Sequence, residues 1–452
     1  MSTLSLFGRV ALLAVFLAAI CGCIGTGPTL PPVQLKVTTR VITEEERRAE
    51  TAPAPAAPAV GIEQHEKKFV VVVNGAKSKE YDRIGKPGQG DGWDIVIPPP
   101  LYDGEISYSP NRKRVAYIAK RGEKWLAVVD GKEEKEYDDV SYLQFSPDSK
   151  GVAYCAVRNG KGFVVVNGKE TETGMVKGLE FSPDSKRIAY VALENRKEAV
   201  VLDGIKGKGY DYVDFRYHPG DEKLVFSPDS KRLAYMAVSG KKMFMVIDGV
   251  ESDEYDSIGN GLAFSPDSKR VAYVAIRDKK MMVVVDGTEG PKYDGILGVY
   301  FSQDSKKIMY AAIRGRKWYI VIDGVEVRQF PYDVKASSWP KFVFSPNAQR
   351  YACVAQAKGK KQMVIVDGVK SVEYDGVCNG DIGVAWSPDS RHVAYWALRD
   401  RKWRIVVDGT ESEFEGVNPI SGVWFESPTR IKARAFKEGV GEIYMDIEVD
   451  ES

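Results

Sequence analysis

Residues Phe264–Asp294 read F-S-P-D-S-K-R-V-A-Y-V-A-I-R-D-K-K-M-M-V-V-V-D-G-T-E-G-P-K-Y-D. The same phrase returns, with substitutions, along the 452-residue chain at a spacing of about 40 residues. Its Ser-Pro pair begins at Ser109, Ser146, Ser182, Ser227, Ser265, Ser345, Ser387 and Ser427, with Ser302-Gln303 as a variant. Its Asp-Gly or Asn-Gly pair begins at Asn74, Asp130, Asn167, Asp203, Asp248, Asp286, Asp323, Asp367 and Asp408. A period of this size predicts a repeat architecture, in which each unit packs mainly on its neighbours.

Each unit reads as four short strands, which we name a to d in chain order. Ser-Pro-Asp-Ser is a good turn between strands a and b, because Pro fixes φ and the Asp and Ser side chains bond local amides. Asp-Gly after a β-branched run predicts a tight hairpin between strands c and d, because both residues accept a positive φ. Strands b and c are apolar at nearly every position, which indicates that both faces of each sheet are buried. Blades of a β-propeller have this property, so we expect a single all-β propeller of four-stranded blades.

The ends of the repeated region predict how the array is completed. The region opens with a c–d pair, Phe69 to Asp82, and it ends with strands a and b after Gly422. We expect these N- and C-terminal strands to share one blade, because this arrangement removes free sheet edges. The blade count is then nine, or eight if the terminal hairpin is spare.

The units resemble the TolB-type propeller repeat, a WD-like family in which a Ser-Pro-Asp turn precedes a strand of the form Lys-x-Ile-Ala-Tyr or Lys-x-Ile-Ala-Phe. Residues Ser182–Tyr190, S-P-D-S-K-R-I-A-Y, carry this likeness clearly, although the fourth turn residue is mostly Ser here and mostly Gly in the family. The resemblance implies a β-propeller. It is a likeness to the repeat and not to TolB as a whole, which has an α/β domain ahead of its propeller. It therefore implies no function by itself.

Residues 1–22 are predicted to be a signal peptide. Arg9 is the one charged residue in it, and the apolar run from Val10 to Ile20 is too short for a typical membrane-spanning helix. The following Cys-Gly-Cys resembles a bacterial lipoprotein signal, which implies a lipid on Cys23 because the small Gly22 precedes it. Lipidation at Cys21 and an ordinary secretory signal are the alternatives.

Residues 23–66 contain alternating Pro and Ala, a composition that favours an extended tether over a packed core. The propeller is expected to occupy residues 67–452. A lipid on Cys23 would place it in the cell envelope, on the periplasmic face of a bacterial membrane. The outer membrane is favoured because no Asp follows the cysteine.

The charge composition argues against nucleic-acid binding. Lys and Arg number 64 and Asp and Glu number 63, so no net positive field attracts a phosphate backbone. The b–c loops are locally basic, but aspartates follow strand d on the same face. We expect these charges to neutralise one another. The repeated Tyr-Asp pairs, such as Tyr255-Asp256, are interpreted as structural because they occur in nearly every unit.

The places where the repeat is interrupted are better candidates for binding. The longest intervals fall between strands d and a, at residues 85–102, 211–222, 329–340 and 375–381, and we expect them to share one face. Exposed Trp, Tyr and Arg are common interface anchors. The predicted contacts to an envelope protein or polymer are therefore Trp93, Arg216, Tyr217, His218 and Trp339. The alternative is that these aromatic side chains only pack on the propeller.

Catalytic signatures are weak. The chain has no G-x-S-x-G, no H-E-x-x-H and no phosphate-binding glycine loop, and it has three histidines. We therefore expect a monomeric, non-enzymatic scaffold without a cofactor or metal. The alternative is a propeller hydrolase or lyase acting on an envelope glycan or peptide through Asp214, His218 and Glu180. Cys155 and Cys353 lie in apolar runs and are expected to be buried thiols.

Overall fold

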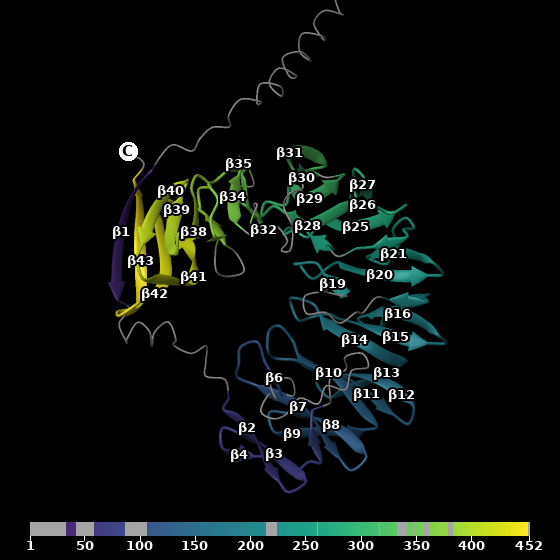
Figure 1. The fold of residues 1–452 in the computed structure, drawn as a ribbon. Coiled ribbons are helices and arrows are strands. Elements are labelled where there is room, and N and C mark those ends of the chain that lie inside the picture. The colour runs from purple at the N-terminus through teal and green to yellow at the C-terminus, as the bar shows by residue number, and fades with distance from the viewer. Residues whose placement is uncertain are drawn as a thin grey trace, which may run out of the picture. The chain divides into compact units, whose positions relative to one another are not determined.

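The computed structural model describes residues 33–41, 58–85, 106–213, 224–259, 261–315, 317–331, 341–347, 349–356, 359, 361–377 and 383–450. The chain divides into two compact units, residues 44–292 and residues 1–43 with 293–452. Each unit is built from antiparallel β-sheets, and no helix is assigned within the described ranges (Figure 1). Over those same residues, there is accordingly no helix long and apolar enough to cross a membrane.

The unit formed by residues 44–292 contains six of these sheets within its described part. The first sheet contains β2 (Val60–His65), β3 (Lys68–Val73) and β4 (Ala76–Lys77). The second contains β5 (Arg83–Ile84), β6 (Ile106–Tyr108), β7 (Val115–Arg121), β8 (Lys124–Val129) and β9 (Lys132–Tyr137). The third sheet contains β10 (Asp139–Phe145), β11 (Val152–Arg158), β12 (Lys161–Val166) and β13 (Lys169–Thr173). The fourth contains β14 (Met175–Phe181), β15 (Ile188–Glu194), β16 (Lys197–Leu202) and β17 (Ile205–Tyr210). The fifth sheet contains β18 (Tyr212–Val213), β19 (Leu224–Phe226), β20 (Leu233–Ser239), β21 (Lys242–Ile247) and β22 (Val250–Glu251). The sixth contains β23 (Ser257–Ile258), β24 (Ala263–Phe264), β25 (Val271–Arg277), β26 (Lys280–Val285) and β27 (Thr288–Glu289).

The other unit contains four sheets within its described part. The first sheet contains β28 (Gly295–Phe301), β29 (Ile308–Arg314), β30 (Lys317–Ile322) and β31 (Val325–Pro331). The second contains β32 (Lys341–Phe344), β33 (Tyr351–Gln356), β34 (Gln362–Val366) and β35 (Val369–Lys370). The third is β36 (Gly376–Val377), β37 (Val384–Trp386), β38 (Val393–Arg399), β39 (Lys402–Val407), β40 (Thr410–Phe414). The fourth orders its strands as β1 (Gln34–Val41), β43 (Gly441–Asp450), β42 (Arg430–Lys437) and β41 (Val417–Phe425).

The predicted four-strand unit is confirmed. In the β23–β27 sheet, strand b pairs with strand c in continuous antiparallel register from Ala272↔Val285 to Arg277↔Lys280. The c–d hairpin turns at an Asp-Gly pair whose φ values are positive, for example 53° at Asp248 and 81° at Gly249. A Cβ is disfavoured at such φ values, which is why Gly recurs there.

Apolar side chains of strands b and c fill the space between successive sheets. One cluster joins Ala234 and Met245 of the β18–β22 sheet to Tyr273, Ala275 and Met282 of the following sheet. Similar clusters lie between the other neighbouring sheets of each unit. The expectation that strands b and c are buried on both faces is therefore correct.

The Ser-Pro turns are linked from sheet to sheet by hydrogen bonds. The amide of Asp184 donates to Oγ of Ser230 in the next sheet at 2.9 Å, and Ser230 is 1% exposed. Equivalent bonds run from Asn111 to Ser149, from Asp148 to Ser185, from Asp229 to Ser268 and from Asn347 to Ser390. The fourth turn residue is therefore Ser because its hydroxyl accepts the amide of the preceding turn.

The ends of the chain are completed differently from the sequence-based expectation. N- and C-terminal strands do share a sheet, but the N-terminal strand is β1, which pairs with β43 from Gln34↔Asp450 to Val41↔Ile443. The Phe69 to Asp82 pair instead joins β2 in a separate three-stranded sheet. Residues 34–41 and 60–65 are thus strands, although the Pro/Ala composition around them predicts a tether over 23–66.

The C-terminal sheet differs from the repeated sheets because its two faces are unlike. Ile431 and Met445 belong to the face packed on the preceding sheet and are fully buried. The opposite face carries the charged residues Lys432, Arg434 and Glu442, with Arg434 and Glu442 paired at 3.0 Å, and also the partly exposed Trp424 and Phe436. Strands b and c of the repeated sheets are apolar at nearly every position, whereas in the C-terminal sheet buried apolar residues alternate with more exposed ones.

Replacing Ser230 by Ala should lower the free energy of unfolding by about 1 kcal/mol, because the Asp184 amide loses the buried hydroxyl that accepts its hydrogen bond. Chemical denaturation would measure the change. Arg112→Ala is the matched control, since Arg112 holds the same turn position with a positive φ of 56° but belongs to the first Ser-Pro turn. An equal loss in both variants would contradict the assigned role of the hydroxyl.

Candidate functional site

The predicted contact residues fall outside the part of the chain that the structure describes. This holds for the lipidation site and for all five candidate partner contacts: Cys23, Trp93, Arg216, Tyr217, His218 and Trp339. Of the alternative catalytic group, Glu180 is described and lies exposed on β14, whereas Asp214 and His218 are outside the described residues. The structure does, however, show where the interruptions carrying the predicted contacts leave the sheets.

Three of the interruptions lie inside strand a and not between strands d and a. Strand a begins directly after the Tyr-Asp pair, as β5, β18 and β36, and resumes after the interruption as β6, β19 and β37. In the β18–β22 sheet, Val213 pairs with Ala237 and Leu224 pairs with Tyr235, so the interruption faces one residue of strand b. The sequence-based placement of these three interruptions between strands d and a is therefore wrong, because a short first part of strand a precedes each of them.

Sheets with an uninterrupted strand a have a register shift at the same point. In β14 the shift lies between Val176 and Gly178, and in β28 it lies between Leu297 and Val299. A β-bulge adds residues to one strand without breaking the ladder on either side. The interruptions thus occupy the bulge position of the repeat, and within each unit they leave from equivalent points of strand a.

The repeated Tyr-Asp pairs hold neighbouring sheets together. Tyr137 is buried with its ring edge-on to Tyr154 at 6.1 Å, and its hydroxyl donates to Glu170 at 2.6 Å. Arg158 binds both oxygens of Glu170, at 2.9 and 3.0 Å. The same set recurs around Tyr81, Tyr293 and Tyr374. The structural interpretation of these pairs is confirmed for the described copies.

This arrangement shifts the pKa values of its members in opposite directions. The guanidinium of Arg158 and then the hydroxyl of Tyr137 lower the pKa of Glu170 to about 2. Burial and the adjacent Glu170 raise the pKa of Tyr137 well above its usual value. Glu170 therefore stays ionised and Tyr137 stays protonated over the physiological range, as required of fixed hydrogen-bond partners rather than proton-transfer groups.

The basic b–c loops are neutralised by the aspartates that follow strand d. Lys197 binds one oxygen of Asp211 at 2.6 Å, and the other oxygen accepts the amide of Gly240 in the next sheet at 2.7 Å. Asp82, Asp138, Asp256 and Asp375 make corresponding contacts. The expectation of a neutralised face is therefore correct in these sheets.

The cysteines and acidic groups offer no reactive centre in the described ranges. Cys155 and Cys353 are buried free thiols, and burial raises the pKa of Cys353 to about 12. Because the thiolate is the reactive form, neither cysteine is poised for nucleophilic attack. The described residues contain no cluster of three His, Cys, Asp or Glu side chains able to hold a metal ion.

An arginine clasp lies on the turn side of four described junctions between sheets. Arg114 binds Asp130 at 2.8 Å through Nε, and its Nη1 donates to the carbonyl oxygens of Ser149 and Lys150 in the next sheet. Its guanidinium lies 5.1 Å from the ring centroid of Phe145. Arg187, Arg232 and Arg350 make the same contacts to Asp and to the next turn. His392 takes this position in the β36–β40 sheet, with Nδ1 at 2.6 Å from Asp408.

Three other described sheets have no arginine at this position: Gly151 precedes Val152, Lys307 precedes Ile308, and His392 precedes Val393. The clasp is also missing at the junction of the β2–β4 and β5–β9 sheets. The amide of Ala59 donates to Oδ1 of Asn74 at 2.9 Å, just as the amide of Val115 donates to Asp130. This register puts Pro58 where Arg114 stands in the next sheet, and Asn74 where Asp130 stands. A neutral Asn is sufficient there because no guanidinium needs a carboxylate.

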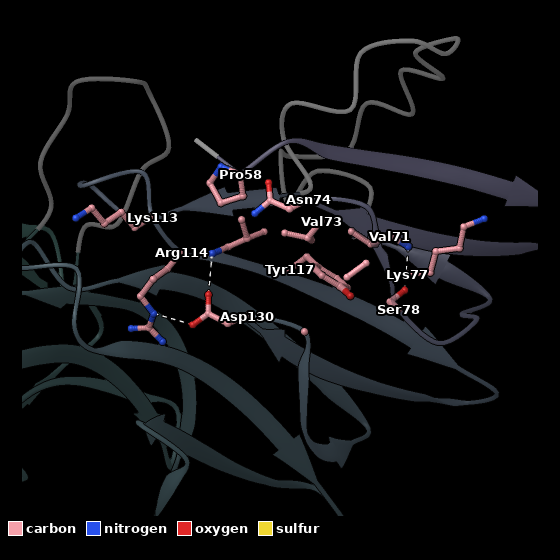
Figure 2. A pocket seen from close by; sticks show the side chains of 13 residues that line it. Pro58, Val71, Val73, Asn74, Lys77, Ser78, Lys113, Arg114, Tyr117 and Asp130 are labelled. Atoms are coloured by element: carbon pink, nitrogen blue, oxygen red, sulfur yellow. Dashed lines mark hydrogen bonds and ion pairs between the residues drawn. The ribbon is translucent and has the colours of Figure 1, made fainter. Parts of the chain in front are cut away.

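A cavity of about 470 Å³ opens at this junction (Figure 2). Its floor is apolar, with Val71 and Val73 on β3 and Tyr117 on β7, and its rim carries Lys77 and Lys113. Figure 2 shows the labelled side chains of both sheets around the open space, with Pro58 beside Asn74. The cavity is thus bounded by two adjacent sheets and has a mixed apolar and cationic lining.

The cavity can hold a group but has no free acid–base pair. Asp130, the one carboxylate among its lining residues, is engaged by Arg114 at 2.8 Å and by the amide of Val115 at 3.0 Å. The lining is suited to an extended segment or side chain with an apolar body and a polar or anionic end. Sequence reasoning missed this site, although Pro58 departs from the Arg, Lys, Gly or His that holds this position in the other units.

No family model matches this chain, and no curated protein matches it. Among solved structures, a chain described as Kuenenia stuttgartiensis Hydrazine Synthase is 15% identical, with coverage of 62% of this chain and 99% of that chain. The TM-score is 0.27, so this similarity carries no inference about activity.

Installing the clasp by the double substitution Pro58→Arg and Asn74→Asp should raise the free energy of unfolding by about 0.5 to 1 kcal/mol. The new guanidinium would pair with the new carboxylate of the same sheet, as Arg114 pairs with Asp130. Denaturant titration would measure the gain. Asn74→Asp alone is the control and should give no gain, because it adds a carboxylate without a cation. A double variant no more stable than this control would contradict the assignment of the cavity to a missing arginine.

Proposed function

We propose that this protein is a non-enzymatic, lipid-anchored β-propeller of the cell envelope that binds a protein or polymer partner. In this proposal the sheets from β5 to β40 are eight complete blades, flanked by two sheets built from the ends of the chain. The irregular segments of strand a, together with the segment between β31 and β32 that carries Trp339, make contact with the partner. The regular parts of the repeat hold the blades in place and take no part in binding.

The placement of the interruptions is the observation that carries the proposal. Three of the four leave the sheets at the bulge position of strand a, while the repeated Tyr, Asp, Arg and Ser groups are engaged in bonds between sheets. Variation confined to one point of a rigid repeat is typical of binding proteins, in which loops carry function on a fixed scaffold. The interruption at 214–223 carries Arg216, Tyr217 and His218, which suit an interface anchor.

The position of β1 shortens the tether that the proposal requires. Because β1 begins at Gln34, a chain lipidated at Cys23 would reach its first sheet over the intervening residues alone. Fully extended, such a connection spans about 35 Å. The anchor would thus hold the body close to the membrane surface, and the binding segments would face envelope components within that distance.

Replacing Trp93, Tyr217 and Trp339 together by Ala should weaken saturable capture of an envelope component at least tenfold, because buried aromatic anchors dominate interfaces. Purified protein would be cross-linked to isolated envelope fractions and titrated. The control replaces Ile205, Val250 and Val325 by Ala, since these side chains are 76%, 70% and 63% exposed on the turn side. Equal capture by both triple variants would sink the choice of binding residues.

Cys23→Ser should abolish incorporation of labelled fatty acid and release the protein from the membrane fraction, because a thiol is needed for the lipid linkage. Cys21→Ser is the matched control and should keep both properties. Labelling followed by fractionation would read both outcomes. Full labelling of the Cys23→Ser variant would refute lipidation at this position.

A further inference from the structure

Glu198 is a buried carboxylate at a position where the other described sheets carry none. It is the second residue of β16 and is 4% exposed. Its Oε2 accepts the amide of Val213 in the next sheet at 3.0 Å, and Val213 is fully buried. Its other oxygen is bound by Nζ of Lys177. Both oxygens of a carboxylate that is removed from water are therefore used.

The three residues tie together the strands a of two successive sheets. Lys177 lies at the bulge of β14, between Val176 and Gly178, and its Nζ is 5.0 Å from the ring centroid of Tyr212. Tyr212 and Val213 form β18, the short strand after which the interruption at 214–223 begins. Glu198 thus links Tyr212 and Val213, the last two described residues before that interruption, to the bulge of the preceding sheet.

A neutral counterpart exists in the other unit. Gln362 holds the position of Glu198 in strand c, and its Oε1 accepts the amide of Val377 at 2.6 Å. Val377 ends β36, directly before the interruption at 378–382. The corresponding residues of the remaining sheets are Phe69, Trp125, Gly162, Met243, Met281, Trp318 and Trp403. An acceptor side chain at this position therefore coincides twice with an interruption in the following strand a.

We propose that Glu198, held by Lys177, is a positioning residue that fixes the root of the 214–223 segment for partner binding, and that Gln362 fixes the root of 378–382. The inference rests on the function proposed above, because it assigns 214–223 to the binding surface. Its physical basis is separate. A buried amide without an acceptor is costly, and so is a buried carboxylate without its cation.

Limited digestion with a low concentration of trypsin tests the positioning role of Glu198 in the absence of a partner. Mass spectrometry would measure the rate of cleavage after Arg216. Glu198→Ala should accelerate this cleavage about tenfold, because the Val213 amide loses its acceptor. Glu198→Gln should cleave at nearly the wild-type rate, since an amide oxygen accepts the same bond at Gln362. Gln362→Ala is the matched control and should leave cleavage at Arg216 unchanged.

Lys177 provides a second test that does not depend on truncating Glu198. Lys177→Met leaves a buried carboxylate without its cation and should also accelerate cleavage about tenfold. Combining it with Glu198→Gln should restore a rate near that of the wild type, a coupling that general loosening of the sheet would not produce. Wild-type cleavage in Glu198→Ala would overturn the proposal, as would equal acceleration at Arg216 by Gln362→Ala.

The same variants separate this inference from the proposed function. Faster cleavage together with weaker capture of the envelope component would support both. Faster cleavage with unchanged capture would support the positioning role and overturn its link to binding, so that the assignment of Arg216, Tyr217 and His218 to the interface would fail on its own.

Discussion

Each sheet of the repeat depends on its neighbours to cover its apolar faces. Strands b and c are buried on both sides, and the clusters that bury them lie between one sheet and the next. A lone unit would expose two hydrophobic surfaces, so stability comes from the stacking of units rather than from any one of them. The rest of the structure consists of devices that keep adjacent sheets in register while this burial is maintained.

The polar residues of the repeat supply those devices. A turn hydroxyl accepts the amide of the preceding turn, a buried tyrosine reaches a glutamate on the next sheet, and an arginine clasps an aspartate and two carbonyls. Each bond is directional and satisfies groups that stacking would otherwise bury unpaired. Repetition of these residues thus reflects geometry that every junction must satisfy, and binding is left to positions that do not repeat.

Much of the fold could be predicted from the sequence because its determinants are local. Asp-Gly and Ser-Pro-Asp-Ser specify turns through φ and side-chain bonds, and unbroken apolar runs specify burial on two faces. The pairing of β1 with β43 could not be predicted, because it joins Gln34 to Asp450 without a local signal. The interruptions were misplaced because the two-residue strand before them has no pattern of its own. Glu198 and Pro58 were visible only as departures from the repeat, and their partners come from another sheet.

The C-terminal sheet bears on how such a chain can change in length. The face packed on the preceding sheet is apolar, whereas the opposite face carries the charged residues Lys432, Arg434 and Glu442. Duplication of an interior unit adds a sheet whose two faces match those already present, and the turn bonds continue through it. Duplication of this last sheet would bury a charged face against an apolar one. A unit inserted in the middle of the chain would therefore bury no charged face, whereas a second copy of this last sheet would.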